Sequence, residues 1–103
     1  MSFFEFVRVH KFVMVHFWAI WNGHDIEMKR LIESEIPDDL AKRVALATFN
    51  VDPPEHHELC REHHLINLPC LEFYRDGSLL RTSIGLIEPA VITQYLKELV
   101  GCP

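Results

Sequence analysis

The side chains of this chain that could do chemistry gather in two short segments and at one isolated cysteine. The first segment is a turn that follows an apolar run and reads Trp21-Asn22-Gly23-His24-Asp25. It holds an amide, an imidazole and a carboxylate, groups that cap a helix, exchange protons or bind a metal. The second segment, residues 56–64, has four histidines and a cysteine, and the isolated cysteine is Cys70, directly after Pro69.

The histidine-rich segment has the composition of a metal site but not its usual spacing. If it is helical, His56, Cys60 and either His63 or His64 share one face. Zinc accepts nitrogen and sulfur ligands, but a structural zinc site usually needs four of them. No Cys-x-x-Cys or His-Glu-x-x-His pattern is present. A solvated, histidine-rich helix is therefore the favoured interpretation, with metal binding as the alternative.

Length, charge and cysteine content limit the class of protein. The 103 residues, 49% of them hydrophobic, predict one domain over residues 1–103. The net charge of -5, without a basic patch, argues against a nucleic-acid partner. Charged residues interrupt the apolar first twenty residues, so no membrane span or signal peptide is expected. The odd number of cysteines, Cys60, Cys70 and Cys102, favours a reducing compartment, and we expect a cytoplasmic protein without a cofactor.

Hydrophobic periodicity predicts alternating helices and strands. Apolar runs predict buried strands, and the Asp76-Gly77 dipeptide predicts a hairpin between the last two. Amphipathic spacing and helix-start signals predict the helices. In chain order, the expected elements are a short helix (2–10), a strand (12–18), a helix (23–35), a strand (43–51), a helix opening at residues 52–54, two strands (70–75 and 78–84) and a closing helix (88–100).

This order of elements, and residues within them, resemble the thioredoxin family over about residues 3–100. The resemblance implies an α/β fold, a thioredoxin-like three-layer sandwich in which helices cover both faces of a mixed four-stranded sheet. It also implies that Pro69 is a cis-proline facing the turn at residues 21–25. The matching points are Val15-His16-Phe17-Trp18-Ala19 with Trp21 and Gly23, Phe49-Asn50-Val51-Asp52, Ile66-Asn67-Leu68-Pro69, Leu71-Glu72-Phe73-Tyr74 with Asp76-Gly77, and Gly85.

The sequence departs from the family pattern at the residues that carry its chemistry. The two cysteine positions of the family's Cys-x-x-Cys motif hold Asn22 and Asp25, and its buried carboxylate is replaced by His16. The family's first strand has no room ahead of the first helix. The strand at residues 43–51 is then expected at an exposed sheet edge, where a homodimer could form.

Two interpretations of the turn and two of Cys70 remain open. Asn22 and Asp25 are expected to cap the helix, while the alternative pairs Asp25 with His16 in a buried acid–base couple. Cys70 is expected to be inert, but residues 70, 72 and 74 alternate with Leu71 and Phe73, so Cys70 shares a strand face with the polar residues Glu72 and Tyr74. That pattern indicates some exposure, and a reactive thiol or a metal ligand beside His24 and Asp25 is the alternative.

The resemblance places a peptide-binding groove between the turn and the cis-proline. It would be lined by Trp21, Leu68, Pro69, Cys70 and Gly85. We therefore expect a redox-inactive thioredoxin-fold protein that binds a peptide or protein partner there through backbone pairing. The alternative is an atypical thiol-disulfide oxidoreductase, active in cell redox homeostasis, that uses Cys70 as a lone thiol.

Overall fold

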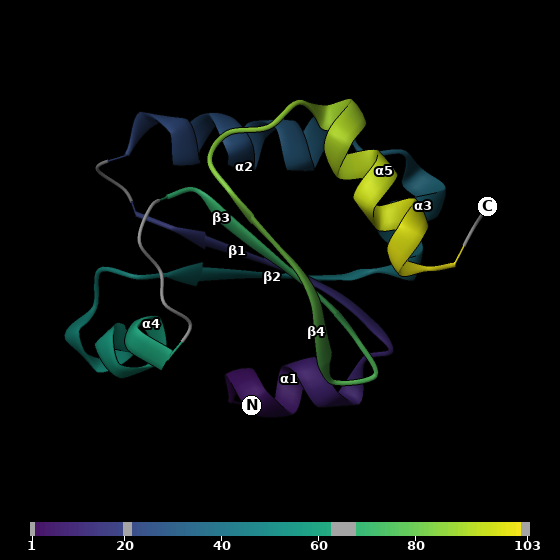
Figure 1. Ribbon diagram of the computed structural model, residues 1–103. Helices are drawn as coiled ribbons and strands as arrows, with labels where there is room; N and C mark the ends of the chain where they lie inside the picture. The colour runs from purple at the N-terminus through teal and green to yellow at the C-terminus, as the bar shows by residue number, and fades with distance from the viewer. Residues whose placement is uncertain (1, 20–21, 63–67, 102–103) are drawn as a thin grey trace.

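The computed structural model describes residues 2–19, 22–62 and 68–101, and its centre is a mixed four-stranded sheet (Figure 1). The strand order is β2-β1-β3-β4, with β1 parallel to β2 and antiparallel to β3, which pairs antiparallel with β4. The expected α/β sandwich is confirmed. The strands are β1 (Phe12–Trp18), β2 (Ala45–Asn50), β3 (Cys70–Arg75) and β4 (Ser78–Ile84).

Helices cover both faces of the sheet. Figure 1 shows α2, α3 and α5 above the strands and α1 and α4 below them. The five helices are α1 (Phe3–Val9), α2 (Gly23–Glu35), α3 (Asp38–Arg43), α4 (His57–Glu62) and α5 (Pro89–Leu99), and a short 3-10 turn, η1 (Pro54–His56), precedes α4.

Side chains of β1 and β3 alternate between two apolar cores, because successive residues of a strand point to opposite faces. Met14, Leu71 and Phe73 pack against Met28 of α2 and the buried face of α5. On the other face, Val13, Val15, Phe17, Cys70 and Tyr74 pack with Val7 of α1. The central strands are therefore buried on both sides, which explains why β1 is apolar along most of its length.

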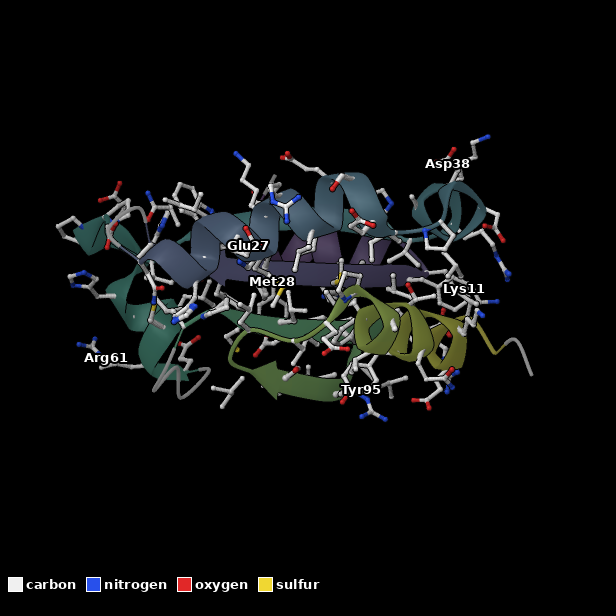
Figure 2. The ribbon with its side chains drawn as sticks, turned by 90° about the horizontal axis from the view of Figure 1, so that it is seen from above. Lys11, Glu27, Met28, Asp38, Arg61 and Tyr95 are labelled. Carbon is white, nitrogen blue, oxygen red and sulfur yellow. The ribbon has the colours of Figure 1, made fainter. Side chains whose placement is uncertain are left out.

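The two long helices, α2 and α5, contact each other over one face of the sheet, as the view from above shows (Figure 2). In α5, Ile92, Leu96 and Leu99 recur at helical spacing and are buried. In α2, Met28 is fully buried, while the adjacent Glu27 is partly exposed and pairs with Arg30. This packing fixes the position of the first turn of α2 above the sheet.

The element boundaries differ from the prediction in two places. Helix α3 was not expected, and β2 begins at Ala45 and not at Arg43. Pro37 precedes α3, acidic residues occupy its first turn and Lys42 and Arg43 its last, which suits the helix dipole. The helix expected from residue 52 is divided into η1 and α4, and α4 ends at Glu62.

Strand β2 lies at one edge of the sheet, as the sequence predicted. The Asp76-Gly77 hairpin is also confirmed, and both of its residues have positive φ angles, 52° and 83°. Within residues 2–19, 22–62 and 68–101, no helix is long and apolar enough to cross a membrane.

Candidate functional site

The turn after β1 is held by a helix cap. The side chain of Asn22 accepts a hydrogen bond from the backbone N–H of His24 at 2.9 Å. The backbone N–H of Asn22 donates to the carbonyl of Ala19 at 3.1 Å. Asn22 therefore acts as the N-cap of α2, as the favoured interpretation predicted. Trp21, the rim residue of the predicted groove, lies outside the described residues.

Asp25 lies in the first turn of α2 with its carboxylate buried beneath the helix. Its side chain is 1% exposed, and its Oδ2 accepts a hydrogen bond from the backbone N–H of Ala19 at 3.0 Å. Burial raises the pKa of this carboxyl above its usual value, although the Ala19 hydrogen bond acts in the opposite direction. The hydrogen bond from Ala19 thus fixes the first turn of α2 to the end of β1. The raised pKa favours the protonated form of the Asp25 carboxyl.

His16 of β1 faces Asp25 from below, so the structure brings together the two residues of the predicted couple. Nε2 of His16 lies 3.6 Å from Oδ1 of Asp25, longer than a hydrogen bond. Within the described part of the chain, both ring nitrogens of His16 and Oδ1 of Asp25 are buried without a hydrogen-bond partner. Burial, and secondarily the charge of Lys29, lowers the pKa of His16 to about 4. The imidazole is therefore neutral at neutral pH.

This arrangement limits the chemistry available at the turn. A neutral imidazole beside a carboxyl of raised pKa can exchange a proton with it. Both side chains are about 1% exposed, so neither can reach a substrate in solution without movement of the helix. Neither Asn22 nor Asp25 can form a disulfide, so the turn by itself carries no thiol chemistry.

The loop before β3 lies next to the turn. The Leu68–Pro69 peptide bond is cis, and the side-chain Nδ2 of Asn22 lies 3.4 Å from the carbonyl oxygen of Leu68. The backbone N–H of Gly85, a residue with φ of 95°, donates to the carbonyl of Pro69 at 2.8 Å. The structure thus brings together the turn, the proline loop and the end of β4, three parts of the predicted groove.

Two residues predicted to line this groove do not reach the surface. Pro69 is fully buried and Cys70 is 1% exposed, so the exposure predicted for Cys70 is wrong. The cause is α1, which covers this face of β3 and places Phe3 with its ring centroid 6.2 Å from that of Tyr74. Burial, reinforced by the charges of Glu72 and Asp25, raises the pKa of the Cys70 thiol to about 12. Cys70 is therefore a buried, protonated thiol.

A second buried polar pair lies on the α1 face of the sheet, and sequence reasoning missed it. Glu72 is 1% exposed at the centre of β3, and the Tyr74 hydroxyl donates a hydrogen bond to its Oε1 at 2.6 Å. Burial, followed by this hydrogen bond and the charge of Glu72, raises the pKa of Tyr74. The available signal was a carboxylate at the centre of a predicted strand, between the apolar residues Leu71 and Phe73.

The described part of the histidine segment, residues 56–62, does not form a metal site. The His56 ring packs on Phe49 with ring centroids 4.3 Å apart, and its Nδ1 lies 2.6 Å from the carbonyl of Asn50. Cys60 is partly buried in α4, while His63 and His64 lie outside the described residues. Among the residues whose positions are described, no three potential ligands converge on one point. A site completed by His63 or His64 stays a prediction.

The sequence matches known proteins over nearly its whole length. A family model of thioredoxin matches residues 1–98. The chain belongs to the thioredoxin family. A thioredoxin from Acidithiobacillus ferridurans is 32% identical over 94 residues, which cover 91% of this chain and 84% of that protein.

Other thioredoxin-family comparisons agree on the fold. A protein disulfide-isomerase from Saccharomyces cerevisiae is 28% identical over 78 residues, covering 76% of this chain but 15% of the isomerase. Among solved structures, mitochondrial thioredoxin 3 from Saccharomyces cerevisiae, in its oxidized form, matches with a TM-score of 0.81. At 22% identity, over 94% of this chain and 87% of that one, this likeness supports the thioredoxin fold and not a shared activity.

Proposed function

We propose that this protein is a redox-inactive member of the thioredoxin family that binds an extended peptide or a partner protein at the end of the sheet near Asn22. The observation that carries the proposal is the replacement of the family's two cysteines by Asn22, a helix cap, and Asp25, a buried carboxyl. Thiol exchange needs a thiolate. The same proposal keeps the cytoplasmic location that the odd number of cysteines indicates.

The other thiols of the described residues support redox inactivity. Burial raises the pKa of Cys70 to about 12, and burial also raises that of Cys60 in α4. A lone thiol at position 70 would react only after α1 had moved away from the sheet. The atypical oxidoreductase that uses Cys70 is therefore the weaker candidate.

Exposed apolar side chains at this end of the molecule support peptide binding. Ile84 is 50% exposed and Leu86 is 42% exposed, on either side of the glycine that bonds to Pro69. Ile26, in the first turns of α2, is 60% exposed. Exposed apolar side chains mark many interaction sites, and these three lie near the ends of β4 and of the turn. We propose that a peptide packs on this rim, in place of the groove floor predicted from Pro69 and Cys70.

The redox half of the proposal is tested by insulin reduction in the presence of dithiothreitol. The wild type and Cys70→Ser are both expected to give the rate of dithiothreitol alone. The double variant Asn22→Cys with Asp25→Cys restores a Cys-x-x-Cys pair at the N-terminus of α2 and is expected to accelerate the reaction. Catalysis by the wild type that disappears in Cys70→Ser would overturn the proposal in favour of the lone-thiol enzyme.

The binding half is tested with carboxymethylated insulin B chain, an unfolded polypeptide without free thiols. In a titration followed by amide NMR, shifts are expected at Asn22, Leu68 and Gly85. Ile84→Lys is expected to weaken binding, whereas Leu79→Lys, at a residue 48% exposed at the other end of β4, serves as the matched control. Equal effects of the two substitutions, or shifts centred elsewhere, would contradict the proposed site.

A further inference from the structure

Strand β2 is an edge strand with features that favour pairing with another strand. In the described part of the chain it pairs with β1 on one side, and its other side forms the end of the sheet. From Ala45 to Asn50 it contains no charged residue, glycine or proline. Proteins usually protect edge strands with charges, prolines or bulges, because free backbone N–H and C=O groups pair readily with another strand. This edge has none of these protections within the strand.

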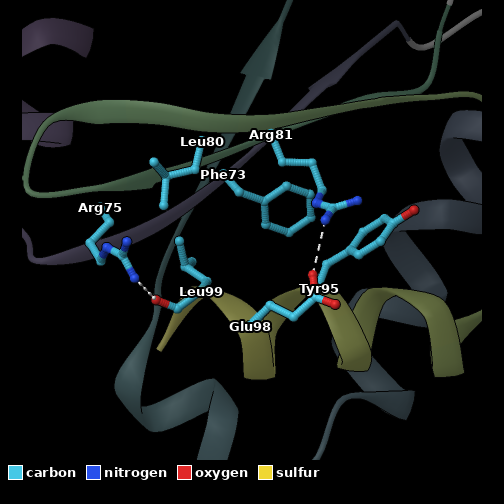
Figure 3. A pocket seen from close by; sticks show the side chains of 7 residues that line it. All are labelled: Phe73, Arg75, Leu80, Arg81, Tyr95, Glu98 and Leu99. Carbon is cyan, nitrogen blue, oxygen red and sulfur yellow. Dashed lines mark hydrogen bonds and ion pairs between the residues drawn. The ribbon is translucent and has the colours of Figure 1, made fainter. Parts of the chain in front are cut away.

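The opposite edge, β4, is protected. Its pairing with β3 is irregular at Phe73 and Tyr74, and it carries the charged residue Arg81. Figure 3 shows Arg81 beside Tyr95, with its guanidinium directed to Glu98. The Arg81–Glu98 ion pair has an N···O distance of 2.9 Å. Arg81, Tyr95 and Glu98 help to line a cavity of about 170 Å³, whose walls have both apolar and charged side chains. The two edges therefore differ in their readiness to accept a strand.

An apolar pocket of about 140 Å³ adjoins the β2 edge. Its one contribution from β2 is Leu46, which is 43% exposed although it lines the pocket together with buried Ile32 of α2 and buried Val44. A strand added to β2 would cover Leu46 and remove apolar surface from water. The pocket is lined by Met14, Ile32, Ile36, Ala41, Val44, Leu46 and Leu96.

The charges at the two ends of β2 indicate which strand fits. Exposed Lys42 and Arg43 precede the strand, and exposed Asp52 and Glu55 follow it. A second β2 in antiparallel orientation brings the basic end of each copy to the acidic end of the other. A parallel arrangement would place like charges together. The edge is thus complementary in charge to itself.

We propose that two copies of this chain associate through antiparallel pairing of their β2 strands, which joins the two sheets into one. With a two-fold axis at Ala47, Leu46 lies opposite Thr48 of the second copy, and Lys42 lies opposite its Asp52. This is an isologous interface, in which each copy offers the same surface. It is independent of the proposed peptide site, which involves the end of β4 at the far edge of the sheet.

Sedimentation of the full chain over about 1 µM to 1 mM tests the association directly. The wild type is expected to shift from monomer to dimer with concentration, and Leu46→Lys is expected to weaken dimerisation by roughly tenfold or more. Leu79→Lys makes the same change at a residue of similar exposure on β4 and is expected to leave the dimer intact. A wild type that is monomeric throughout would overturn the proposal, as would a dimer lost only in Leu79→Lys.

Charge exchange provides a test that does not depend on Leu46. The variant Lys42→Glu with Arg43→Glu is acidic at both ends of β2, and Asp52→Lys with Glu55→Lys is basic at both. Each alone is expected to lose self-association, and their equimolar mixture is expected to form a heterodimer. Circular dichroism of each variant checks that it folds. Folded variants that self-associate like the wild type, or a mixture that stays monomeric, would refute the antiparallel arrangement.

Discussion

The two faces of the sheet each contain a buried polar pair, but only one pair is satisfied. On the α1 face, Tyr74 donates a 2.6 Å hydrogen bond to Glu72. On the α2 face, His16 and Asp25 are separated by 3.6 Å, with three polar atoms lacking a hydrogen-bond partner among the described residues. Buried polar groups without partners are rare, since each costs free energy of folding.

The origin of the two pairs explains the difference. Glu72 and Tyr74 are two residues apart on one strand and point to the same face, so the strand itself fixes their separation. His16 belongs to β1 and Asp25 to α2, and their separation depends on how the helix packs on the sheet. The first pair is a local feature that stabilises β3. The separation of His16 and Asp25 depends on how closely the first turn of α2 packs on the sheet. We therefore expect this pair to make stability more sensitive to substitution and to pH.

The largest expected effect is the acid sensitivity that His16 gives to folding. Its pKa falls from 6.5 to about 4 on burial, so the unfolded state binds the proton more readily. The pH-dependent part of the free energy of unfolding that comes from His16 is fully present above pH 6.5 and is lost as pH falls through about 4. The shift corresponds to roughly 3 kcal/mol. Urea unfolding of the wild type and of His16→Leu between pH 7 and 4 should show that difference in pH dependence.

The control for that experiment is His10→Gln, which removes an exposed histidine. It should retain the pH dependence of the wild type. If His16→Leu loses stability with acid as steeply as the wild type does, burial of a neutral His16 is not the source.

A smaller loss is expected when the satisfied pair is broken. Tyr74→Phe removes the hydroxyl that bonds to Glu72 inside the core, and it should lower the free energy of unfolding by about 1–3 kcal/mol. Tyr95→Phe makes the same chemical change on α5, at a partly buried residue, and should change stability by less than about 0.5 kcal/mol. Chemical denaturation at pH 7 measures both, and equal effects would show that the Glu72 contact contributes little.

The smallest expected effect is a gain in stability, from the substitution Asp25→Asn. Asp25→Asn keeps an acceptor for the Ala19 N–H and provides an amide donor toward Nε2 of His16. Because burial raises the pKa of Asp25, the wild-type residue favours stability at low pH and loses that contribution as pH rises from 3.8 through the folded value. The variant should be more stable at pH 7 by about 1 kcal/mol.

Asp39→Asn is the matched control for this substitution. Asp39 is an exposed carboxylate in the first turn of α3, where negative charge favours the helix dipole. Its loss should destabilise the protein slightly, so the two substitutions should differ in sign. A destabilised Asp25→Asn variant would show that the carboxylate is better satisfied than the 3.6 Å separation indicates.

Much of the fold was predictable because the signals were local. The apolar run in β1, the spacing of Ile92, Leu96 and Leu99, and the Asp76-Gly77 turn each predicted an element that the structure confirms. Helix α3 escaped prediction because its six residues offer too short a period to detect. The acidic residues of its first turn and the basic residues of its last turn fit a helix dipole, but they do not by themselves predict a helix.

The candidate site was predictable in part. The position of Asn22 as a cap followed from its residue type before a helix, and the nearness of His16 to Asp25 followed from the family resemblance. The burial of Cys70 was not predicted. Cys70 shares a strand face with Glu72 and Tyr74, and a face with polar residues is usually exposed to water. Here α1 covers it, and the two polar residues bond to each other.

The sequence by itself determined the four strands and the longer helices, that the turn at residues 22–25 cannot exchange thiols, and which family the chain resembles, because these depend on residue type and short spacings. Only the tertiary structure decided that Cys70 and Glu72 are buried on the face covered by α1 and that Nε2 of His16 stands 3.6 Å from Oδ1 of Asp25. These depend on how separate elements pack, and a difference of less than 1 Å in that packing separates a hydrogen bond from two unsatisfied polar groups.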